Sequence, residues 1–530
     1  MAEGLARRLG TADAVFVGLS AMIGAGIFAA FAPAAGAAGA WLPASLALAA
    51  VVAYCNATSS ARLAARYPES GGTYVYGRRR LGPFWGYLAG WGFTVGKTAS
   101  CAAMALTFGA YVAPDLARPL AIAAVVALTA LNLFGVQRSA TAARVMVALV
   151  LVVLATVVGA AFLSHPPTSG GMGDTSTAAS DQGVQPVPSD GAGETLPLNA
   201  KIIDKEQVIQ LSDLAGLPDG PARSFVQALT AEVADPGLWG VLQGAGLLFF
   251  AFAGYARIAT MGEEVRDPGR TIPHAIQLAL GITLVVYALV AAAALTELGP
   301  WALANSAAPL ADVVDAAGAA WLRPVVGAGA AVAALGALLA LLLGVSRTVL
   351  AMARERDLPA VLAVLSPVRP ALGGPPASGR PEDTSGGSAA SGRSEDASGG
   401  SGDSARAQDV SGGSSAVSGG AVQVPRRAEL VVSAAVIGLL LVADLRGAIG
   451  FSSFGVLVYY AIANASALTL ARDEGAPPKV VSGLGLLLCL GLAATLPGQS
   501  VLAGLAVFAV GAVVWAVRHR PWDGRSGGLS

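Results

Sequence analysis

The stretch Ser20-Ala21-Met22-Ile23-Gly24-Ala25-Gly26-Ile27-Phe28 forms the middle of an apolar run from Val15 to Phe31. The run is long enough to cross a membrane as a helix, but two glycines one residue apart weaken helical pairing at its centre, because Gly costs about 1 kcal/mol relative to Ala inside a helix. Hydrocarbon cannot satisfy the backbone groups released there, so protein or a polar cavity has to surround them. The stretch therefore predicts either a midplane cavity for a small zwitterionic ligand or close helix packing through small residues.

The composition places the chain among polytopic membrane proteins. Of its 530 residues, 55% are hydrophobic and 12% are charged, and the net charge is zero, which argues against a nucleic-acid partner. The three Cys and three His residues are far apart, and the apolar stretches contain no paired carboxylates, no Ser/His arrangement and no metal-ligand spacing. We therefore expect no enzyme activity, no cofactor and no bound metal.

Apolar stretches of about 20 residues are interpreted as membrane spans. They predict twelve spans, near residues 13–33, 40–62, 83–113, 117–136, 142–163, 238–261, 273–296, 321–349, 428–444, 448–470, 479–496 and 499–517. Lys and Arg in the short loops fall almost entirely on one side, which the positive-inside rule identifies as cytoplasmic. This pattern predicts a multi-pass protein of the cell membrane with both termini in the cytoplasm.

Two polar segments divide the apolar pattern. Residues 164–236 are acidic and are placed outside the cell, whereas residues 366–425 are rich in Gly and Ser and are placed in the cytoplasm. Both are expected to be mostly disordered. The predicted organisation is a cytoplasmic N-terminus (1–12), a first five-helix repeat (13–163), the acidic loop (164–236), a second five-helix repeat (237–470) interrupted by 366–425, helices eleven and twelve (471–517) and a cytoplasmic tail (518–530).

The sixth span is also interrupted by glycines, the last of which is Gly254. It crosses the membrane in the direction opposite to the first span, because five spans, an odd number, separate the start of the first span from the start of the sixth. Spans one to five and six to ten therefore predict two inverted repeats. Secondary transporters built in this way bind substrate at the midplane, between the broken first helices of the two repeats.

Three stretches carry a resemblance to a known family. They are Gly24-Ala25-Gly26-Ile27-Phe28 in the first span, Tyr67-Pro68-Glu69-Ser70-Gly71-Gly72-Thr73-Tyr74 before the third, and Glu263-Glu264-Val265-Arg266-Asp267-Pro268-Gly269-Arg270-Thr271-Ile272-Pro273 after the sixth. In this order they resemble the amino acid-polyamine-organocation (APC) superfamily of permeases over residues 10–517, apart from the two polar segments. The resemblance implies an all-α membrane protein with the leucine-transporter-type fold, in which two C-terminal helices follow a five-plus-five inverted repeat.

The resemblance also implies a substrate site at the two interrupted helices. Backbone amides around Gly24, Ala25 and Gly26 would hold the substrate carboxylate, and the dipole of a helix end favours an anion there. Carbonyls near Met22 and in Phe252-Ala253-Gly254 would receive the ammonium group, and Phe252 or Tyr255 would close over the side chain, unless these rings only pack. The implied substrate-binding residues are Met22, Ile23, Gly24, Ala25, Gly26, Ile27, Phe252, Ala253, Gly254 and Tyr255.

Lys97 and Arg257 are the charged residues placed deepest in the membrane. Lys97 lies near the middle of the third span with no carboxylate at the same depth. Because burial opposes its charged form, it is a candidate for coupling transport to a proton, with a structural bond to carbonyls as the alternative. Arg257, with Glu263 and Glu264, is a candidate gate or substrate contact, unless Arg257 snorkels or pairs with those glutamates. Arg78-Arg79-Arg80 is interpreted as a topology signal, with gating second.

The residues near the end of the sixth span favour a neutral or even an acidic substrate. Members of the resembled superfamily that carry cationic amino acids often have an acidic residue two positions after the last glycine of this span, where this chain has Ala256. We therefore predict a secondary active amino acid transporter that works by alternating access, either as a proton-coupled symporter or as an exchanging antiporter. A membrane-embedded amino acid sensor and a cationic amino acid exchanger are the alternatives. The expected partners are an amino acid, a proton and the lipid bilayer.

Overall fold

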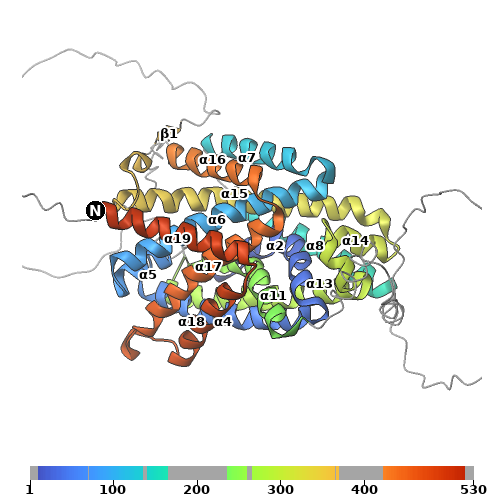
Figure 1. The fold of residues 1–530 in the computed structure, drawn as a ribbon, viewed down its shortest axis with the longest axis horizontal. Coiled ribbons are helices and arrows are strands. Elements are labelled where there is room, and N and C mark those ends of the chain that lie inside the picture. The colour runs from blue at the N-terminus through green and yellow to red at the C-terminus, as the bar shows by residue number, and fades with distance from the viewer. Residues whose placement is uncertain are drawn as a thin grey trace, which may run out of the picture.

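The computed structural model describes residues 10–69, 71–134, 140–164, 236–259, 265–364, 366–368 and 422–519. Most of both predicted polar segments therefore lies outside the described residues. Figure 1 shows the described helices gathered into one bundle, in which α6, α15 and α17 run through the middle. Long helices dominate because the apolar stretches of this sequence can satisfy their backbone groups only within the helix.

The helices and strands follow one another as set out here, with η marking 3₁₀ helices. The N-terminal part contains α1 (Thr11–Met22), α2 (Ala25–Ala29), α3 (Phe31–Ala38), η1 (Gly39–Trp41), α4 (Leu42–Arg66), α5 (Thr73–Arg80), α6 (Pro83–Val112), η2 (Pro114–Leu116), α7 (Ala117–Leu133) and α8 (Ala140–Ser164). The C-terminal part contains α11 (Gly237–Phe252), η3 (Ala253–Tyr255), α12 (Ala256–Ala259), α13 (Pro268–Asn305), α14 (Pro309–Ala316), η4 (Ala320–Leu322), α15 (Arg323–Arg354), η5 (Ala360–Ala363), β1 (Ser366–Val368), β2 (Val422–Val424), α16 (Arg426–Val442), α17 (Leu445–Leu468), η6 (Arg472–Glu474), α18 (Lys479–Thr495) and α19 (Gly498–Arg518).

Nine helical stretches within the described ranges are long and apolar enough to cross a membrane. Large apolar side chains are exposed on their outward faces, among them Leu163, Leu278 and Val513, as expected where lipid is the solvent. The chain is therefore a multi-pass membrane protein. The other three of the twelve predicted spans coincide with α6, α16 and α18, of which α16 and α18 have only 17 residues each. A count of twelve spans stays a prediction.

One short element departs from the helical pattern. Strands β1 and β2 pair antiparallel, with Ser366 opposite Val424 and Val368 opposite Val422. Both strands fall inside the segment 366–425, which the sequence predicted to be mostly disordered. The pairing brings the two ends of residues 369–421 together directly before α16 begins.

The length of α13 has a local explanation. This element of 38 residues contains Gly299, whose φ of 68° and ψ of 172° are not helical, and Pro300 follows at once. Only glycine adopts such a positive φ without strain, and proline readily begins a new helical turn. The element is therefore a membrane-length helix followed by a short second helix.

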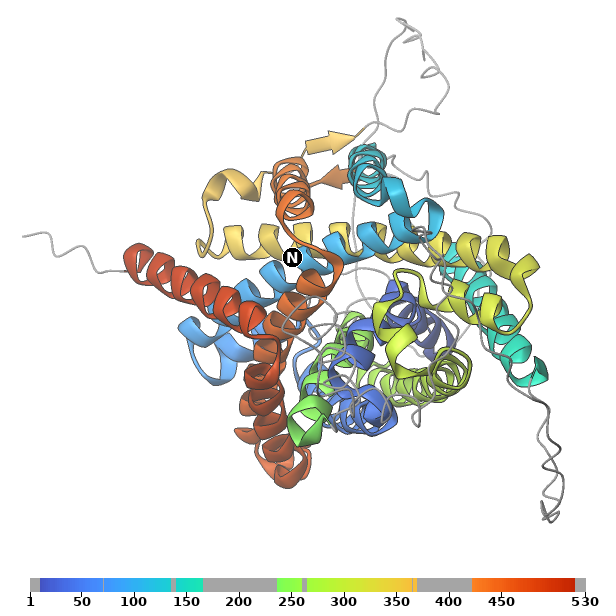
Figure 2. The same ribbon diagram turned by 45° about the vertical axis from the view of Figure 1, so that its right-hand side comes forward.

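The interrupted helices sit together on one side of the bundle. Figure 2 shows the green α11 and α13 clustered with the blue N-terminal helices, beside the yellow α15. Within this cluster, α13 packs against α1, α3 and α4, and α11 packs against α3 and α4. Segments from the two halves of the chain thus interleave around the candidate site.

Candidate functional site

The first membrane helix is interrupted at the glycines that the sequence singled out. Helix α1 ends at Met22, and α2 begins at Ala25. Between them, Ile23 has φ −82° and ψ 47°, and Gly24 has φ −100° and ψ −144°, so neither residue is helical. The predicted lapse in helical pairing therefore spans two residues.

The helix that follows this break is longer than α2 alone. Ala30, between α2 and α3, keeps helical angles, its N–H bonds the carbonyl of Gly26, and its own carbonyl accepts from Ala34. The pairing is disturbed because Pro33 has no N–H to donate. A nearly continuous helix from Ala25 to Ala38 thus points its first amides at the break, with no side chain capping them.

The second interruption lies in the sixth membrane helix. Helix α11 ends at Phe252, and the 3₁₀ turn η3 covers Ala253–Tyr255 before α12 begins. A 3₁₀ segment in the middle of a helix often marks a functional hinge, because its backbone hydrogen bonds have poorer geometry. The turn includes Gly254, one of four glycines at which the sequence predicted an interruption; the other three, Gly240, Gly244 and Gly246, lie within the continuous helix α11.

Glycines let the two interruptions touch. A Cβ atom on Gly254 would lie 2.4 Å from the carbonyl carbon and oxygen of Ala21, and a Cβ on Gly26 would lie 2.8 Å from Cα of Ala251. Real Cβ atoms essentially never approach other atoms this closely, so only glycine fits at either position. Close helix packing was one of the two interpretations of the stretch that contains Gly24 and Gly26, and Gly26 is closely packed. Gly254 is closely packed as well.

Tyr287 of α13 joins the two interruptions through its hydroxyl group. The Oη atom lies 2.6 Å from the carbonyl oxygen of Met22 and 3.1 Å from that of Ala251. Its ring contacts Phe252 and Phe31, with centroids 5.0 and 6.1 Å away. The side chain is fully buried. Neither Tyr287 nor Ala251 was predicted from the sequence, since a lone Tyr in an apolar span carries no pattern.

The hydroxyl of Tyr287 cannot satisfy both carbonyls at once. A phenol has one hydrogen to donate, and both neighbours are acceptors. One of the two carbonyls is therefore without this donor at any moment. An additional donor, such as an ammonium group, would complete the arrangement.

The remaining predicted site residues surround these interruptions. Ile23 and Ile27 are buried, and a Cβ on Gly24 would lie 3.0 Å from Cβ of Ala337 on α15. Tyr255 is turned away from Tyr287: its ring packs 5.0 Å from the ring of Tyr460 on α17. Of the two aromatic candidates, Phe252 lies against Tyr287 and Tyr255 lies against α17.

Lys97 is buried within α6, with 6% of its surface exposed. It shares a helix face with Gly90 and Thr94, and both of these contact Met352 of α15. Among the described residues, Lys97 takes part in none of the ion pairs. Lys97 thus lies on a face of α6 that packs against α15.

Comparison with known proteins identifies the family. The sequence profile described as amino acid permease matches residues 9–371, which is most of the apolar part. The chain belongs to this family of amino acid permeases, within the APC superfamily. This agrees with the resemblance carried by the three sequence stretches.

Three relatives show how the permease compares with other transporters. It is 53% identical over 515 residues to an uncharacterized transporter of Mycobacterium tuberculosis strain H37Rv, covering 97% of this chain and 92% of the relative. It is 26% identical to the branched-chain amino acid permease BcaP of Bacillus subtilis, covering 69% of this chain and 71% of the relative. It is 25% identical to the chloroplastic cationic amino acid transporter 7 of Arabidopsis thaliana, covering 69% of this chain and 57% of the relative.

At the predicted cytoplasmic end of the permease, α5 is tied to the end of α15. Asp357 has a fully buried side chain that accepts hydrogen bonds from Arg78 at 2.8 Å and from the Tyr74 hydroxyl at 2.6 Å. The ring of His519, directly after α19, lies 3.6 Å from the other oxygen of Asp357. Arg78 is thus part of a buried ion pair as well as a topology signal.

Two further contacts tie α5 to other elements at the predicted cytoplasmic end. Arg80 pairs with Glu474 of η6, which lies in a loop outside the membrane spans. The amide of Ala471 and the Arg80 guanidinium bond the carboxylate and lower the pKa of Glu474 to about 2. The backbone amide of Thr73 donates to the hydroxyl of Tyr459 on α17 at 3.1 Å. Helix α5 therefore joins several elements at this end of the molecule.

The predicted gate residues after the sixth span are only partly described. Arg257 lies in α12 and is partly buried. Glu263 and Glu264 lie outside the described residues, so a pairing between them and Arg257 stays a prediction.

At the opposite, predicted outer end, Tyr111 of α6 connects α2 with α14. Its hydroxyl donates to the carbonyl of Phe28 at 3.0 Å and accepts from the amide of Leu310 at 3.1 Å. A cavity of about 480 Å³ lies at this end and reaches Ala29 and Ala32 of the first helix. Charged side chains of both signs line it: Asp115, Arg118, Asp444 and Arg446.

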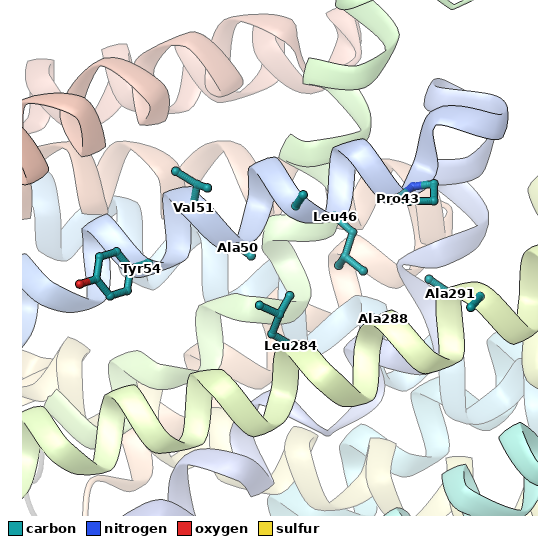
Figure 3. Close-up of a pocket in the computed structure, with 10 residues that line it drawn as sticks. Pro43, Leu46, Ala50, Val51, Tyr54, Leu284, Ala288 and Ala291 are labelled. Carbon is teal, nitrogen blue, oxygen red and sulfur yellow. The ribbon is translucent and has the colours of Figure 1, made fainter.

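A second cavity has a different chemistry. A groove of about 670 Å³ lies between α4 and α13. Figure 3 shows Leu46 of α4 and Leu284 of α13 pointing toward each other across it. Its lining is apolar apart from the Tyr54 hydroxyl, and Tyr54 and Val51 are about half exposed on the outer surface. The groove offers no groups that recognise an ammonium or a carboxylate, and it fits the lipid-facing surface.

Proposed function

We propose that this permease carries a neutral amino acid across the membrane by alternating access, with the substrate bound between the two interrupted helices. The family establishes the general activity of amino acid transport. The observation that carries the proposed site is the shared hydroxyl of Tyr287, which brings the freed carbonyls of Met22 and Ala251 to one point.

The substrate carboxylate is proposed to bind the amides that begin the helix after the first break. The amides of Ala25, Gly26 and Ile27 have no intrahelical partner, and no side chain caps them. The positive end of the helix dipole, which continues through α3, adds a favourable field for an anion.

The substrate ammonium is proposed to bind the carbonyls beside Tyr287. It brings three donors, whereas the Tyr287 hydroxyl brings one for the two acceptors of Met22 and Ala251. Hydrogen bonds from a charged donor are worth about 1.5–3 kcal/mol each, which exceeds the neutral bond that they replace. Carbonyls of η3 lie next along the chain and would serve as further acceptors for the ammonium group.

The side chain of the substrate is proposed to be uncharged. The rings of Phe252 and Phe31 and the methyl group of Ala337 lie near the two breaks, and the side-chain hydroxyls there, of Tyr287 and Thr283, are uncharged. A cationic side chain buried against them would lack a counter-charge and cost several kcal/mol. The Bacillus subtilis relative is named a branched-chain amino acid permease, which agrees with an uncharged side chain. The Arabidopsis thaliana relative is named a cationic amino acid transporter.

Coupling is proposed to run through Lys97. An ammonium group buried without a carboxylate is costly, so release and rebinding of its proton can alternate during a transport cycle. The face that Lys97 shares with Thr94 looks toward α15, the same helix that packs against Gly24. A change in its charge can therefore act on the interface that also borders the first break.

The substrate is proposed to enter through the outer cavity, pass the Tyr111 contact and reach the two helix breaks. It would then leave on the cytoplasmic side, at the end where Arg78 of α5 is paired with Asp357. Both signs of charge line the outer cavity, which suits a zwitterion. The buried pair of Arg78 and Asp357 closes the other end. Alternating access would require the outer contact and the inner pair to break in turn.

Binding can be tested by thermal unfolding of the purified permease with a panel of amino acids. A ligand at 100 times its Kd stabilises a protein by about 2.7 kcal/mol. We expect a neutral apolar amino acid to raise the melting temperature, and its methyl ester and its deaminated analogue to have little effect. Equal stabilisation by the ester would contradict the proposed carboxylate contact, and stabilisation by Arg or Lys alone would contradict the neutral substrate.

A further inference from the structure

Glu429 is a buried carboxyl group far along the chain from the proposed substrate site. It lies in the first turn of α16, and none of its surface is exposed. Neither carboxylate oxygen has a hydrogen-bond partner, and Glu429 takes part in no ion pair within the described ranges. An ionised carboxylate kept in this state would cost several kcal/mol.

Asn132 of α7 is the polar neighbour of Glu429. Its side chain interacts with the Glu429 carboxyl, but its amide oxygen and nitrogen form no hydrogen bond of normal geometry. Only 1% of its surface is exposed. Helices α7 and α16 lie side by side along one edge of the bundle, next to α15 (Figure 1). Four buried polar atoms on two facing side chains are therefore unpartnered.

The hydroxyl groups one turn away have no hydrogen to spare for the carboxylate. Thr129 donates its hydrogen to the carbonyl of Val125 at 2.6 Å. The Ser433 hydroxyl lies 2.7 Å from that of Thr129, so Ser433 must be the donor of this second bond. Both hydrogens are used, and the hydroxyls offer Glu429 only lone pairs.

The positive charges on the surrounding helices do not neutralise Glu429. Arg347 of α15 acts on it electrostatically but is itself exposed and forms no ion pair with it. Arg426 and Arg427, in the same turn of α16, are also exposed. The packed helices α6 and α7 carry only Lys97 and Arg118, and neither is paired with Glu429 in the described part of the chain.

We propose that Glu429 and Asn132 form a proton-binding site between α7 and α16. A protonated carboxyl can donate to the amide oxygen of Asn132 and accept from its amide nitrogen, which satisfies all four polar atoms together. An ionised carboxylate can only accept, and it would leave the amide oxygen without a donor. The proton moves from solvent to one carboxylate oxygen, and no other bond changes.

Infrared spectroscopy of the purified full chain tests this site without relying on transport. We expect the absorption band of a protonated carboxylic acid near neutral pH in the wild type, and its loss in Glu429→Gln. Asp473→Asn, which removes an exposed carboxylate, is the matched control and keeps the band. Asn132→Leu removes the partner while retaining the acid, so it shifts the band. An unchanged spectrum in both Glu429→Gln and Asn132→Leu overturns the proposal.

Thermal unfolding separates a proton from a metal ion at the same site. A carboxyl group that binds its proton more tightly in the folded state stabilises the fold less as pH rises above its unfolded pKa, which is about 4.3 for Glu. The Tm of the wild type should therefore fall relative to that of Glu429→Gln as pH rises above about 4.3. The same scans with sodium replaced by choline should coincide. A sodium-dependent rise in Tm that Glu429→Gln abolishes would show a metal site and overturn the proton assignment.

Discussion

The hydroxyl oxygen of Tyr287 lies 2.6 Å from the carbonyl oxygen of Met22, although the two residues are 265 positions apart in the chain. The same oxygen is 3.1 Å from the carbonyl of Ala251, so one side chain of α13 holds both interrupted helices. Because this hydroxyl has a single hydrogen, it can donate to only one of the two carbonyls at a time. We propose that an amino acid ammonium group supplies the second donor.

Tyr287→Phe is the first test of this arrangement. The ring contacts remain, but two buried carbonyls lose their shared donor, at a cost of about 1–3 kcal/mol. We expect lower thermal stability without ligand and amino acid binding weakened about tenfold, because the carbonyls are no longer held in place. Tyr87→Phe is the control, since the buried hydroxyl of Tyr87 has no partner. Binding by Tyr287→Phe equal to that of the wild type would contradict the role of the hydroxyl.

Gly254→Ala tests the contact between the two breaks. The new Cβ would lie 2.4 Å from backbone atoms of Ala21, which have no rotamer through which to escape. We expect a loss of about 1–3 kcal/mol in the free energy of unfolding and a loss of uptake in proteoliposomes. Gly281→Ala on α13 meets nothing within 4 Å and should be as stable as the wild type or more so. Normal uptake by Gly254→Ala would show that the close approach is dispensable.

Arg78→Gln tests the closure at the predicted cytoplasmic end. Removing the guanidinium leaves the fully buried Asp357 carboxylate with the Tyr74 hydroxyl and the His519 ring beside it, and losing a hydrogen bond to a charged group costs about 1.5–3 kcal/mol. Addition of Asp357→Asn should restore part of this stability in a double-mutant cycle. Arg79→Gln, which breaks an exposed pair with Glu69, should cost about 1 kcal/mol or less. Additive effects of the two changes would contradict the pairing.

Glu474 gives a prediction for acid pH. Its pKa falls from 4.5 to about 2 in the folded protein, because the amide of Ala471 and the guanidinium of Arg80 bond its charged form. A lowered folded pKa means that the stabilisation is complete above the unfolded value and is lost as pH falls toward the folded value. The difference in Tm between the wild type and Glu474→Gln should therefore be constant near neutral pH and shrink below about pH 4.5. Asp473→Asn serves as the control, and a difference that grows with acid would contradict the assignment.

The helices and their interruptions could be predicted because their causes are local. The length and apolar character of the spans limit the chain to helices, and the pair Gly24 and Gly26 weakens one of them whatever surrounds it. The same reasoning assigned a break to the sixth span but did not choose Gly254 over Gly240, Gly244 and Gly246, which stay helical. The short pairing of Ser366–Val368 with Val422–Val424 had no such signal, because more than 50 residues of Gly/Ser-rich sequence separate the strands.

The partners of the buried polar groups could not be predicted, because they come from distant parts of the chain. Arg78 and Asp357 are 279 positions apart, and nothing in either local sequence names the other. The choice between Phe252 and Tyr255 as the ring beside the breaks also depends on tertiary packing, which turns Tyr255 toward Tyr460. A general rule that a buried Tyr needs a hydrogen-bond partner would have marked Tyr287 as a candidate without giving its role.

The most direct test is uptake of radiolabelled amino acids into liposomes that contain the purified permease, with and without an imposed proton gradient, for the wild type and Lys97→Ala. For the wild type we expect saturable uptake of a neutral amino acid, with accumulation above equilibrium only when the gradient is present. For Lys97→Ala we expect accumulation to be lost and exchange to be retained. Accumulation by Lys97→Ala equal to that of the wild type would contradict coupling through this residue. Binding without flux of any amino acid would contradict transport itself and leave a sensor.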